Sequence, residues 1–275
     1  MRVTFLGTSA GEEYPGIWCE CENCAKARKW GGKNIRRNSA LILDDDVMID
    51  MGKTAHIQAE AFGFNMRKIT TLLITHSHKD HFNIHTLWAR CAAFPPPPRL
   101  NIFGSSQVHE SLVSYNRYDA NYWNVGFNVV EPFRKYCAAD IDIYTLDGNH
   151  KDDEYRSINY VINRKNRTFL YLSDTGYPFE HTLAEIAKFK YDFIITEGTY
   201  GFGADSSEHM GLEKNLRLFE FFNANKLWKA DAEYYVTHVA PHGCPPHDEY
   251  SLILKEHGLI LAYDGLALEY PYNSH

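Results

Sequence analysis

Short runs of apolar and β-branched residues recur along the chain, separated by polar and turn-forming residues. Runs this short, bounded by turn formers, are typical of strands buried in a sheet. The polar sequence "LDDDV" between the second and third runs predicts a hairpin turn. We therefore expect strands at residues 3–7, 39–43, 47–50, 71–75, 141–146, 157–162, 168–172, 192–196, 234–238 and 259–265.

Longer stretches between these runs have the spacing of apolar positions that an amphipathic helix requires. Their mixture with strands favours an α/β layered fold. The proline-rich sequence "FPPPPR" at 94–99 predicts a stiff connector within one domain, because strand-like sequence resumes directly after it. We treat residues 1–275 as a single domain, with helices expected at 54–65, 83–93, 106–115, 181–190, 211–225 and 247–257.

Residues 115–133, "YNRYDANYWNVGFNVVEPF", are aromatic and polar without a clean period. Two interpretations remain open for this stretch. It forms either a long loop that walls a substrate pocket or an ordinary packed connection between elements.

Composition narrows the class of protein. A chain of 275 residues that is 44% hydrophobic and 14% aromatic can bury a substantial core, which excludes a disordered chain. The net charge of −7 gives no general attraction to nucleic acid or to anionic membranes. No apolar run approaches the roughly 18 residues of a membrane span, and "MRVTFLGTSAG" predicts a strand and a glycine turn instead of a secretion signal. We expect a cytoplasmic protein.

The densest group of candidate ligands follows the strand expected at 71–75. The sequence "THSHKDH" places His76, His78, Asp80 and His81 within six positions. Imidazoles and carboxylates are typical ligands of zinc and related divalent ions. A polar loop that happens to be rich in histidine is the alternative, and four ligand-type residues in six positions argue against it.

Three further candidates, His150, Asp174 and His238, each follow a strand-like run. Each one alone would be equally compatible with a capping residue or a satisfied polar residue. Their shared placement at strand ends, together with the loop at 76–81, predicts one site that holds two metal ions.

The sequence "THSHKDH" matches the HxHxDH motif of the metallo-β-lactamase superfamily, and the later His, Asp and His follow in the superfamily's order. The chain resembles this superfamily over nearly its whole length. The resemblance implies a four-layer αββα sandwich and hydrolysis by water activated at two divalent metal ions. It also implies a role for Asp80 in orienting the attacking water, and the following ligand sets: His76, His78 and His150 for one metal, Asp80, His81 and His238 for the second, and Asp174 bridging both.

The sequence "CECENC" places Cys19, Cys21 and Cys24 close together in an N-terminal loop at about 17–30. Three thiolates predict a tetrahedral structural zinc that needs a fourth ligand. A disulfide is disfavoured by the expected cytoplasmic location, and a redox pair lacks the usual strand–helix–strand context. The fourth ligand is expected from "THVAPHGCPPH", with His242 as the first choice and Cys244 and His247 as alternatives.

These cysteines, with "GTSAG", "LDGNH", "YLSDTGYP" and "YDG", resemble the PhnP-type phosphodiesterases of carbon–phosphorus lyase operons. In that branch a CxCxxC loop and a C-terminal His bind a structural zinc beside a dinuclear site. The resemblance implies hydrolysis of a small phosphodiester, with Zn²⁺ or Mn²⁺ in the active site. It also implies that His209, in "SSEHMGL", lies near the substrate and donates a proton to the leaving alkoxide or hydrogen-bonds the phosphate.

Three alternatives remain from the same resemblance. An RNA-processing nuclease typically carries a basic arm, which is not evident here, so nucleic acid is not an expected partner. A thioesterase would leave the cysteine cluster unexplained. A non-catalytic metal-binding or carrier protein of cofactor biosynthesis would have degraded ligands, whereas every expected ligand is present. The expected partner is therefore a small-molecule phosphodiester, without a membrane, and a homodimer is compatible with such folds.

Overall fold

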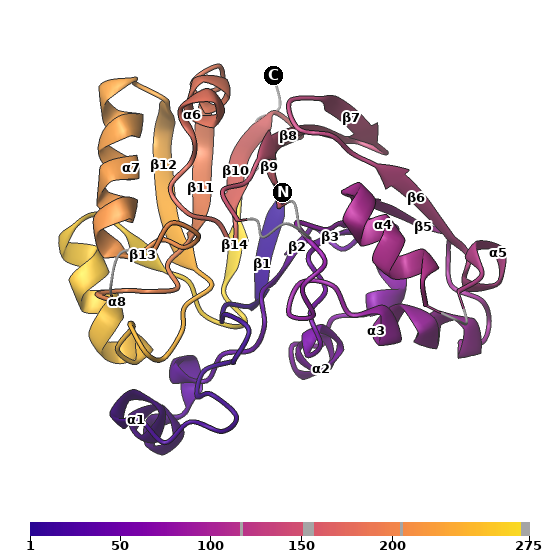
Figure 1. The fold of residues 1–275 in the computed structure, drawn as a ribbon, viewed down its shortest axis with the longest axis horizontal. Coiled ribbons are helices and arrows are strands. Elements are labelled where there is room, and N and C mark those ends of the chain that lie inside the picture. Colours follow the sequence, from indigo (N-terminus) through magenta and orange to yellow (C-terminus); the bar gives the residue numbers. More distant parts are fainter. Residues whose placement is uncertain (116–117, 151–156, 204–205, 271–275) are drawn as a thin grey trace.

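The computed structural model describes residues 1–115, 118–150, 157–203 and 206–270, and the strands in these residues form two seven-stranded sheets. The sheets face one another, and helices lie on the outer side of each sheet (Figure 1). This arrangement is the αββα sandwich expected from the sequence.

The first sheet has the strand order β14-β1-β2-β3-β4-β5-β6. Its first four strands pair antiparallel, and the pairs from β3 to β6 are parallel. The turn between β2 and β3 confirms the predicted hairpin, with Asp44 at a φ of 50°. The strands are β1 (Arg2–Gly7), β2 (Ala40–Leu43), β3 (Val47–Ile49), β4 (Thr71–Leu73), β5 (Leu100–Gly104), β6 (Val125–Val129) and β14 (Ala267–Glu269).

The second sheet has the strand order β13-β12-β11-β10-β9-β8-β7. Strands β7 to β10 pair antiparallel and strands β10 to β13 pair parallel. Because parallel strands end at the same edge of a sheet, the loops after β10, β11 and β12 are neighbours. The strands are β7 (Lys135–Ala138), β8 (Ile141–Asp147), β9 (Ile158–Arg164), β10 (Arg167–Leu172), β11 (Tyr191–Glu197), β12 (Trp228–Thr237) and β13 (Ile260–Leu261).

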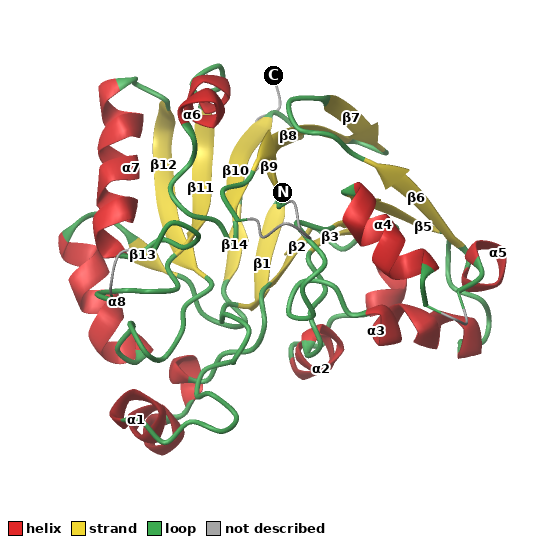
Figure 2. Ribbon diagram, viewed as in Figure 1, coloured by secondary structure: helices red, strands yellow, loops and turns green. Residues whose placement is uncertain are grey.

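Helices α2 (Ala55–Ala61), α3 (Ile84–Trp88), α4 (Ser106–Val113) and α5 (Ala120–Trp123) pack on the first sheet, and α6 (Glu180–Ile186), α7 (Leu212–Ala224) and α8 (His247–Glu256) pack on the second. Helix α1 (Glu22–Trp30) stands apart from both layers, at the bottom of Figure 2. Among the described helices, none combines the length and the apolar character needed to cross a bilayer. Short 3₁₀ turns complete the chain: η1 (Gly32–Asn34), η2 (Met66–Lys68) and η3 (Ala89–Ala92).

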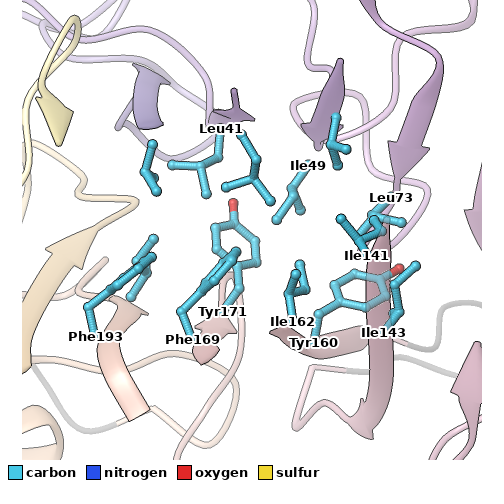
Figure 3. Close-up of a cluster of buried hydrophobic side chains, with 14 of the residues drawn as sticks. Leu41, Ile49, Leu73, Ile141, Ile143, Tyr160, Ile162, Phe169, Tyr171 and Phe193 are labelled. Carbon is cyan, nitrogen blue, oxygen red and sulfur yellow. The ribbon is translucent and has the colours of Figure 1, made fainter. Parts of the chain in front are cut away.

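Strand β2 shows why the strands read as continuous apolar runs. Leu41 and Leu43 point into the cluster between the two sheets, whereas Ala40 and Ile42 point into the cluster under the helices. Successive side chains on a strand face opposite sides, so a strand covered on both faces needs no polar alternation. Figure 3 shows the inner cluster, in which Leu41, Ile49 and Leu73 of the first sheet lie opposite Phe169, Tyr171 and Phe193 of the second.

Two sequence expectations need correction. The stretch at 115–133 is not a long loop, because it contains α5 and the edge strand β6, and Trp123 is buried against the first sheet. The packed-connection interpretation therefore applies, with residues 116–117 outside the described part. The N-terminal segment at 17–30 is not entirely loop either, because α1 begins at Glu22. The single-domain organisation stays a prediction.

Candidate metal centre

The predicted active-site ligands come from the ends of strands in both sheets. The loop after β4 of the first sheet carries four of them. In the second sheet, β8, β10 and β12 each end shortly before one more. The structure brings every one of these residues into two adjacent groups that share a carboxylate: His76, His78, Asp80, His81, His150, Asp174 and His238.

The first group consists of His76, His78, His150 and Asp174. His76 Nε2 lies 2.9 Å from His78 Nδ1 and 3.1 Å from Asp174 Oδ2. His150 Nε2 lies 3.4 Å from His78 Nδ1 and 3.8 Å from the same Asp174 oxygen. Three imidazole nitrogens and a carboxylate oxygen thus converge on one point.

The second group consists of Asp80, His81, Asp174 and His238. His81 Nε2 lies 3.1 Å from His238 Nε2, 3.4 Å from Asp80 Oδ2 and 3.4 Å from Asp174 Oδ2. His238 Nε2 lies 3.7 Å from Asp80 Oδ2 and 3.9 Å from Asp174 Oδ2. Because Asp174 Oδ2 belongs to both groups, this carboxylate can bridge two metal ions.

The donor atoms fit two divalent cations. Within each group the candidate ligand atoms all lie within 4.8 Å of one another. The set of nitrogen and carboxylate oxygen donors suits zinc or manganese. The other oxygen of Asp174, Oδ1, lies 3.0 Å from His209 Nδ1, which leaves Oδ2 to the two groups. Lone pairs that converge this closely repel one another unless a cation lies between them, so the geometry favours metal binding.

Three of the ligand imidazoles are held by a hydrogen bond at their other ring nitrogen. His81 Nδ1 lies 2.8 Å from Asp50 Oδ2, and His238 Nδ1 lies 2.9 Å from Thr199 Oγ1. His76 Nδ1 lies 3.0 Å from Thr75 Oγ1. Partners of this kind orient a metal-binding imidazole and select the nitrogen that faces the metal.

The buried charges of the second group call for a cation. Burial alone lowers the pKa of His81, but the carboxylates of Asp50, Asp80 and Asp174 hold that pKa well above its usual range. In the first group, burial and the neighbouring His81 lower the pKa of His76 to about 4, which keeps its imidazole neutral. A divalent ion in the second group would supply the positive charge that a proton on His81 otherwise provides.

His209 lies beside the shared carboxylate of Asp174. Its Nδ1 is 3.0 Å from Asp174 Oδ1 and 3.6 Å from Glu197 Oε1. Burial lowers its pKa, but hydrogen bonding to these two carboxylates outweighs burial and raises the pKa to about 11. Its ring also lies 5.2 Å from that of His150. The geometry can therefore hold a proton next to the centre.

The three predicted cysteine ligands also meet. The sulfurs of Cys19, Cys21 and Cys24 lie within 4.8 Å of one another. His242 lines the same surface hollow as Cys19 but does not belong to this tight group. The two alternatives have other contacts, since Cys244 Sγ donates to Gly198 O at 3.2 Å and His247 Nδ1 lies 2.9 Å from Arg36 Nη2. The fourth ligand stays a prediction.

The sequence interpretation missed the residues that support the ligands. Asp50 is fully buried and also accepts from Thr75 N at 2.8 Å. Glu197 accepts from Thr199 N at 2.6 Å and from Met210 N, which fixes the segment that carries His209. The one available signal was position, because Asp50 and Glu197 each lie at the end of an apolar strand, as the ligands do.

Comparison with solved structures gives related folds. A new diphosphatase from the PhnP family has a TM-score of 0.77 and 20% identity, covering 98% of each chain. Zn²⁺-bound PqqB from Methylobacterium extorquens has a TM-score of 0.73 and 17% identity, covering 98% of this chain and 100% of that one. The short form of human tRNase Z has a TM-score of 0.62 and 17% identity, covering 98% of this chain and 100% of that one. At these identities the likeness shows the fold.

Comparison at the level of sequence identifies the family. The search of curated proteins finds no match. The family model of the β-lactamase superfamily domain matches residues 46–229, which is more than half of the chain and contains all of the active-site ligand candidates except His238. The chain therefore belongs to the metallo-β-lactamase superfamily and is a metal-dependent hydrolase of that superfamily.

Proposed function

We propose that the chain hydrolyses small phosphodiesters with two divalent cations, Zn²⁺ or Mn²⁺, in the centre. The observation that carries this proposal is the position of His209, held between Asp174 and Glu197 beside both ligand groups. An alkoxide is a poor leaving group and benefits from a proton donor, whereas a thiolate leaves without one. A histidine placed here therefore favours a diester over a thioester.

Each residue of the centre has a distinct task in this proposal. His76, His78 and His150 would hold one cation, Asp80, His81 and His238 the other, and Asp174 both. Bound cations would supply the Lewis acidity that activates water and offsets phosphate charge. Asp80, at the edge of the second group, would also orient the attacking water, and His209 would protonate the leaving oxygen.

The cysteine cluster supports the same branch of the superfamily. Cys19, Cys21 and Cys24 would hold a structural zinc, with His242 as the proposed fourth ligand. One protein of similar fold is a diphosphatase from the PhnP family, so a phosphorus-centred reaction is the consistent choice.

The test compares substrates on one preparation. The metal content of the purified protein is measured, and manganese- and zinc-loaded samples are assayed in parallel on bis(p-nitrophenyl) phosphate, a thioester and a cephalosporin. We expect hydrolysis of the diester above all. The variant Asp80→Ala should lose turnover while it keeps its fold and its cysteine-bound zinc. A protein with two active-site metals and no diesterase activity would refute the proposal.

A further inference from the structure

Two large apolar side chains are held in water at the tip of a tight turn. The turn runs from Gly16 to Cys19, and Cys19 N donates to Gly16 O at 3.1 Å. At its tip, Ile17 is 56% exposed and Trp18 is 95% exposed. Small and polar residues are the usual occupants of turn tips, so an exposed tryptophan here suggests a surface that binds something.

The turn is anchored at several points. Gly16 N donates to Cys24 Sγ at 3.3 Å, and Arg28 Nη2 donates to Gly16 O at 2.9 Å. Asn23 Nδ2 donates to Pro241 O at 2.8 Å, which ties α1 to the segment that follows His238. An indole on so well-anchored a support loses little freedom on binding, and preorganisation of this kind improves affinity.

The indole borders a hollow that lies beside Asp80 of the metal centre. The hollow has a volume of about 630 Å³, and its lining includes Glu12, Ile17, Trp18 and Lys53. Glu12 and Lys53 of this lining are the chain neighbours of Gly11 and Gly52, and both glycines pack against Asp80. A Cβ on Gly11 would lie 3.3 Å from Asp80 Oδ2, and one on Gly52 would lie 2.0 Å from Asp80 O. Lys53 Nζ also donates a hydrogen bond to Gly11 O at 3.1 Å.

The charged residues that line the hollow indicate which chemical groups it can bind. Glu12 and Glu20 are the acidic residues of its lining, against Lys53 as the permanent cation. This balance does not favour a second phosphate, whereas a planar, uncharged ring can stack on the indole, as bases do on aromatic side chains. Ile17 and Trp18 alone offer too little area for a dimer interface. An aromatic side chain buries about 150–250 Å², whereas a stable interface buries about 800 Å² per partner.

We propose that Trp18 is a stacking platform for a neutral planar ring, such as a nucleobase, on the non-leaving arm of the diester. The inference rests on the proposed phosphodiesterase function and adds the chemistry of one arm. The scissile phosphate lies at the metal centre, and this arm extends past Asp80 into the hollow. The other arm leaves on the side of His209.

The test compares two diester substrates that differ in the non-leaving arm and share one leaving group. Thymidine 5′-(p-nitrophenyl phosphate) and ethyl p-nitrophenyl phosphate both release p-nitrophenolate, so one assay measures both with metal-loaded protein. Trp18→Ala should lower kcat/KM for the thymidine substrate about 5- to 100-fold, as expected for one lost stacking contact, and leave the ethyl substrate unchanged. Trp18→Phe should retain most of the preference.

A matched control is Trp30→Ala, because Trp30 is 42% exposed on α1 and packs against Lys26, 5.9 Å from its ring centre. This variant should behave as the wild type with both substrates. If Trp18→Ala lowers kcat/KM equally for both substrates, or for neither, the proposed stacking role of Trp18 is wrong. A wild type that sediments as a dimer beside a monomeric Trp18→Ala would also overturn that role, since Trp18 would then contact a second copy.

Binding separates this inference from the proposed function. The dissociation constant of thymidine 5′-phosphate is measured by calorimetry on the metal-loaded protein, with ethyl phosphate as the comparison. Trp18→Ala should weaken binding of thymidine 5′-phosphate alone. If neither diester is hydrolysed, the proposed function is wrong, and the calorimetric difference still decides whether Trp18 stacks on the ring. Equal binding by wild type and variant would overturn the inference.

Discussion

Asp50 shows how one residue outside the ligand set can control the centre. Its carboxylate accepts from Thr75 N at 2.8 Å, from Thr75 Oγ1 at 3.0 Å and from His81 Nδ1 at 2.8 Å. It is fully buried, with a φ of 58° just after β3. These bonds make His81 present Nε2 to the second ligand group, although Asp50 itself belongs to neither group.

We predict that Asp50→Asn weakens metal binding without unfolding the protein. The amide has the size of the carboxylate, but it loses the charge and places an NH₂ group where one oxygen accepted. Loss of such a partner typically costs about 10- to 100-fold in metal affinity or activity. Competition with a chromophoric chelator measures the affinity. Asp45→Asn, on an exposed residue 2.7 Å from Lys68 Nζ, is the control, and equal affinities in the two variants would contradict the role.

At the scale of elements, a strand could be predicted from the sequence when both of its faces were buried. Strands covered on both faces, such as β2 and β11, read clearly as apolar runs. Strand β6, "VGFNV", was missed because an edge strand with two exposed residues has no continuous apolar pattern. The grouping of the candidate ligands was predictable because His and Asp in a dense group after a strand are distinctive. Asp50 and Glu197 were not, because a single acid after a strand resembles a turn residue.

The cysteine turn and α1 form an element whose predicted role is structural. Cys21→Ser should lose one zinc per chain and lower the melting temperature, while the active-site metals stay bound. The reason is that the sulfurs of Cys19, Cys21 and Cys24 join the turn to the start of α1. Metal analysis and thermal unfolding measure both effects. Cys137→Ser, on an exposed cysteine of β7, should change neither, and a Cys21→Ser protein with full zinc content would refute the site.

At the scale of the whole molecule, a buried arginine joins distant parts of the chain. Arg36 Nη1 donates to Thr8 Oγ1 at 2.7 Å and to Ala262 O at 2.5 Å, and Arg36 Nη2 donates to His247 Nδ1 at 2.9 Å. Because the guanidinium donates, His247 must accept and remain neutral. This network ties the end of the N-terminal strand to α8 and to the segment after β13.

His247 should make the fold sensitive to acid. Burial and the nearby Arg36 lower its pKa to about 3, against about 6.5 in the unfolded chain. Between pH 6.5 and pH 3, His247 is therefore protonated in the unfolded state but stays neutral in the folded state. The free energy of unfolding consequently falls as the pH falls towards 3. The loss approaches about 1.4 kcal/mol per pH unit.

The variant His247→Asn keeps an acceptor for Arg36 and removes this titration. Denaturant unfolding at pH 7 and pH 5 should show a smaller loss of stability on acidification than in the wild type. The difference should be about 2 kcal/mol, since the interval below pH 6.5 spans roughly 1.5 pH units. Asp264, whose burial raises its pKa to about 6, is present in both proteins and largely cancels. Identical losses would contradict the assignment.

Because the candidate ligands come from both sheets, bound metal ions would link the two sheets of the sandwich. His76, His78, Asp80 and His81 follow β4, whereas His150, Asp174 and His238 belong to the opposite sheet. Cations bound between them favour the closed sandwich over the open chain by mass action, by about 1.4 kcal/mol for each tenfold rise in free metal above the dissociation constant. The supply of metal would thereby set the free energy of unfolding as well as the chemistry of the centre, and melting temperatures that rise with added Mn²⁺ or Zn²⁺ would show it.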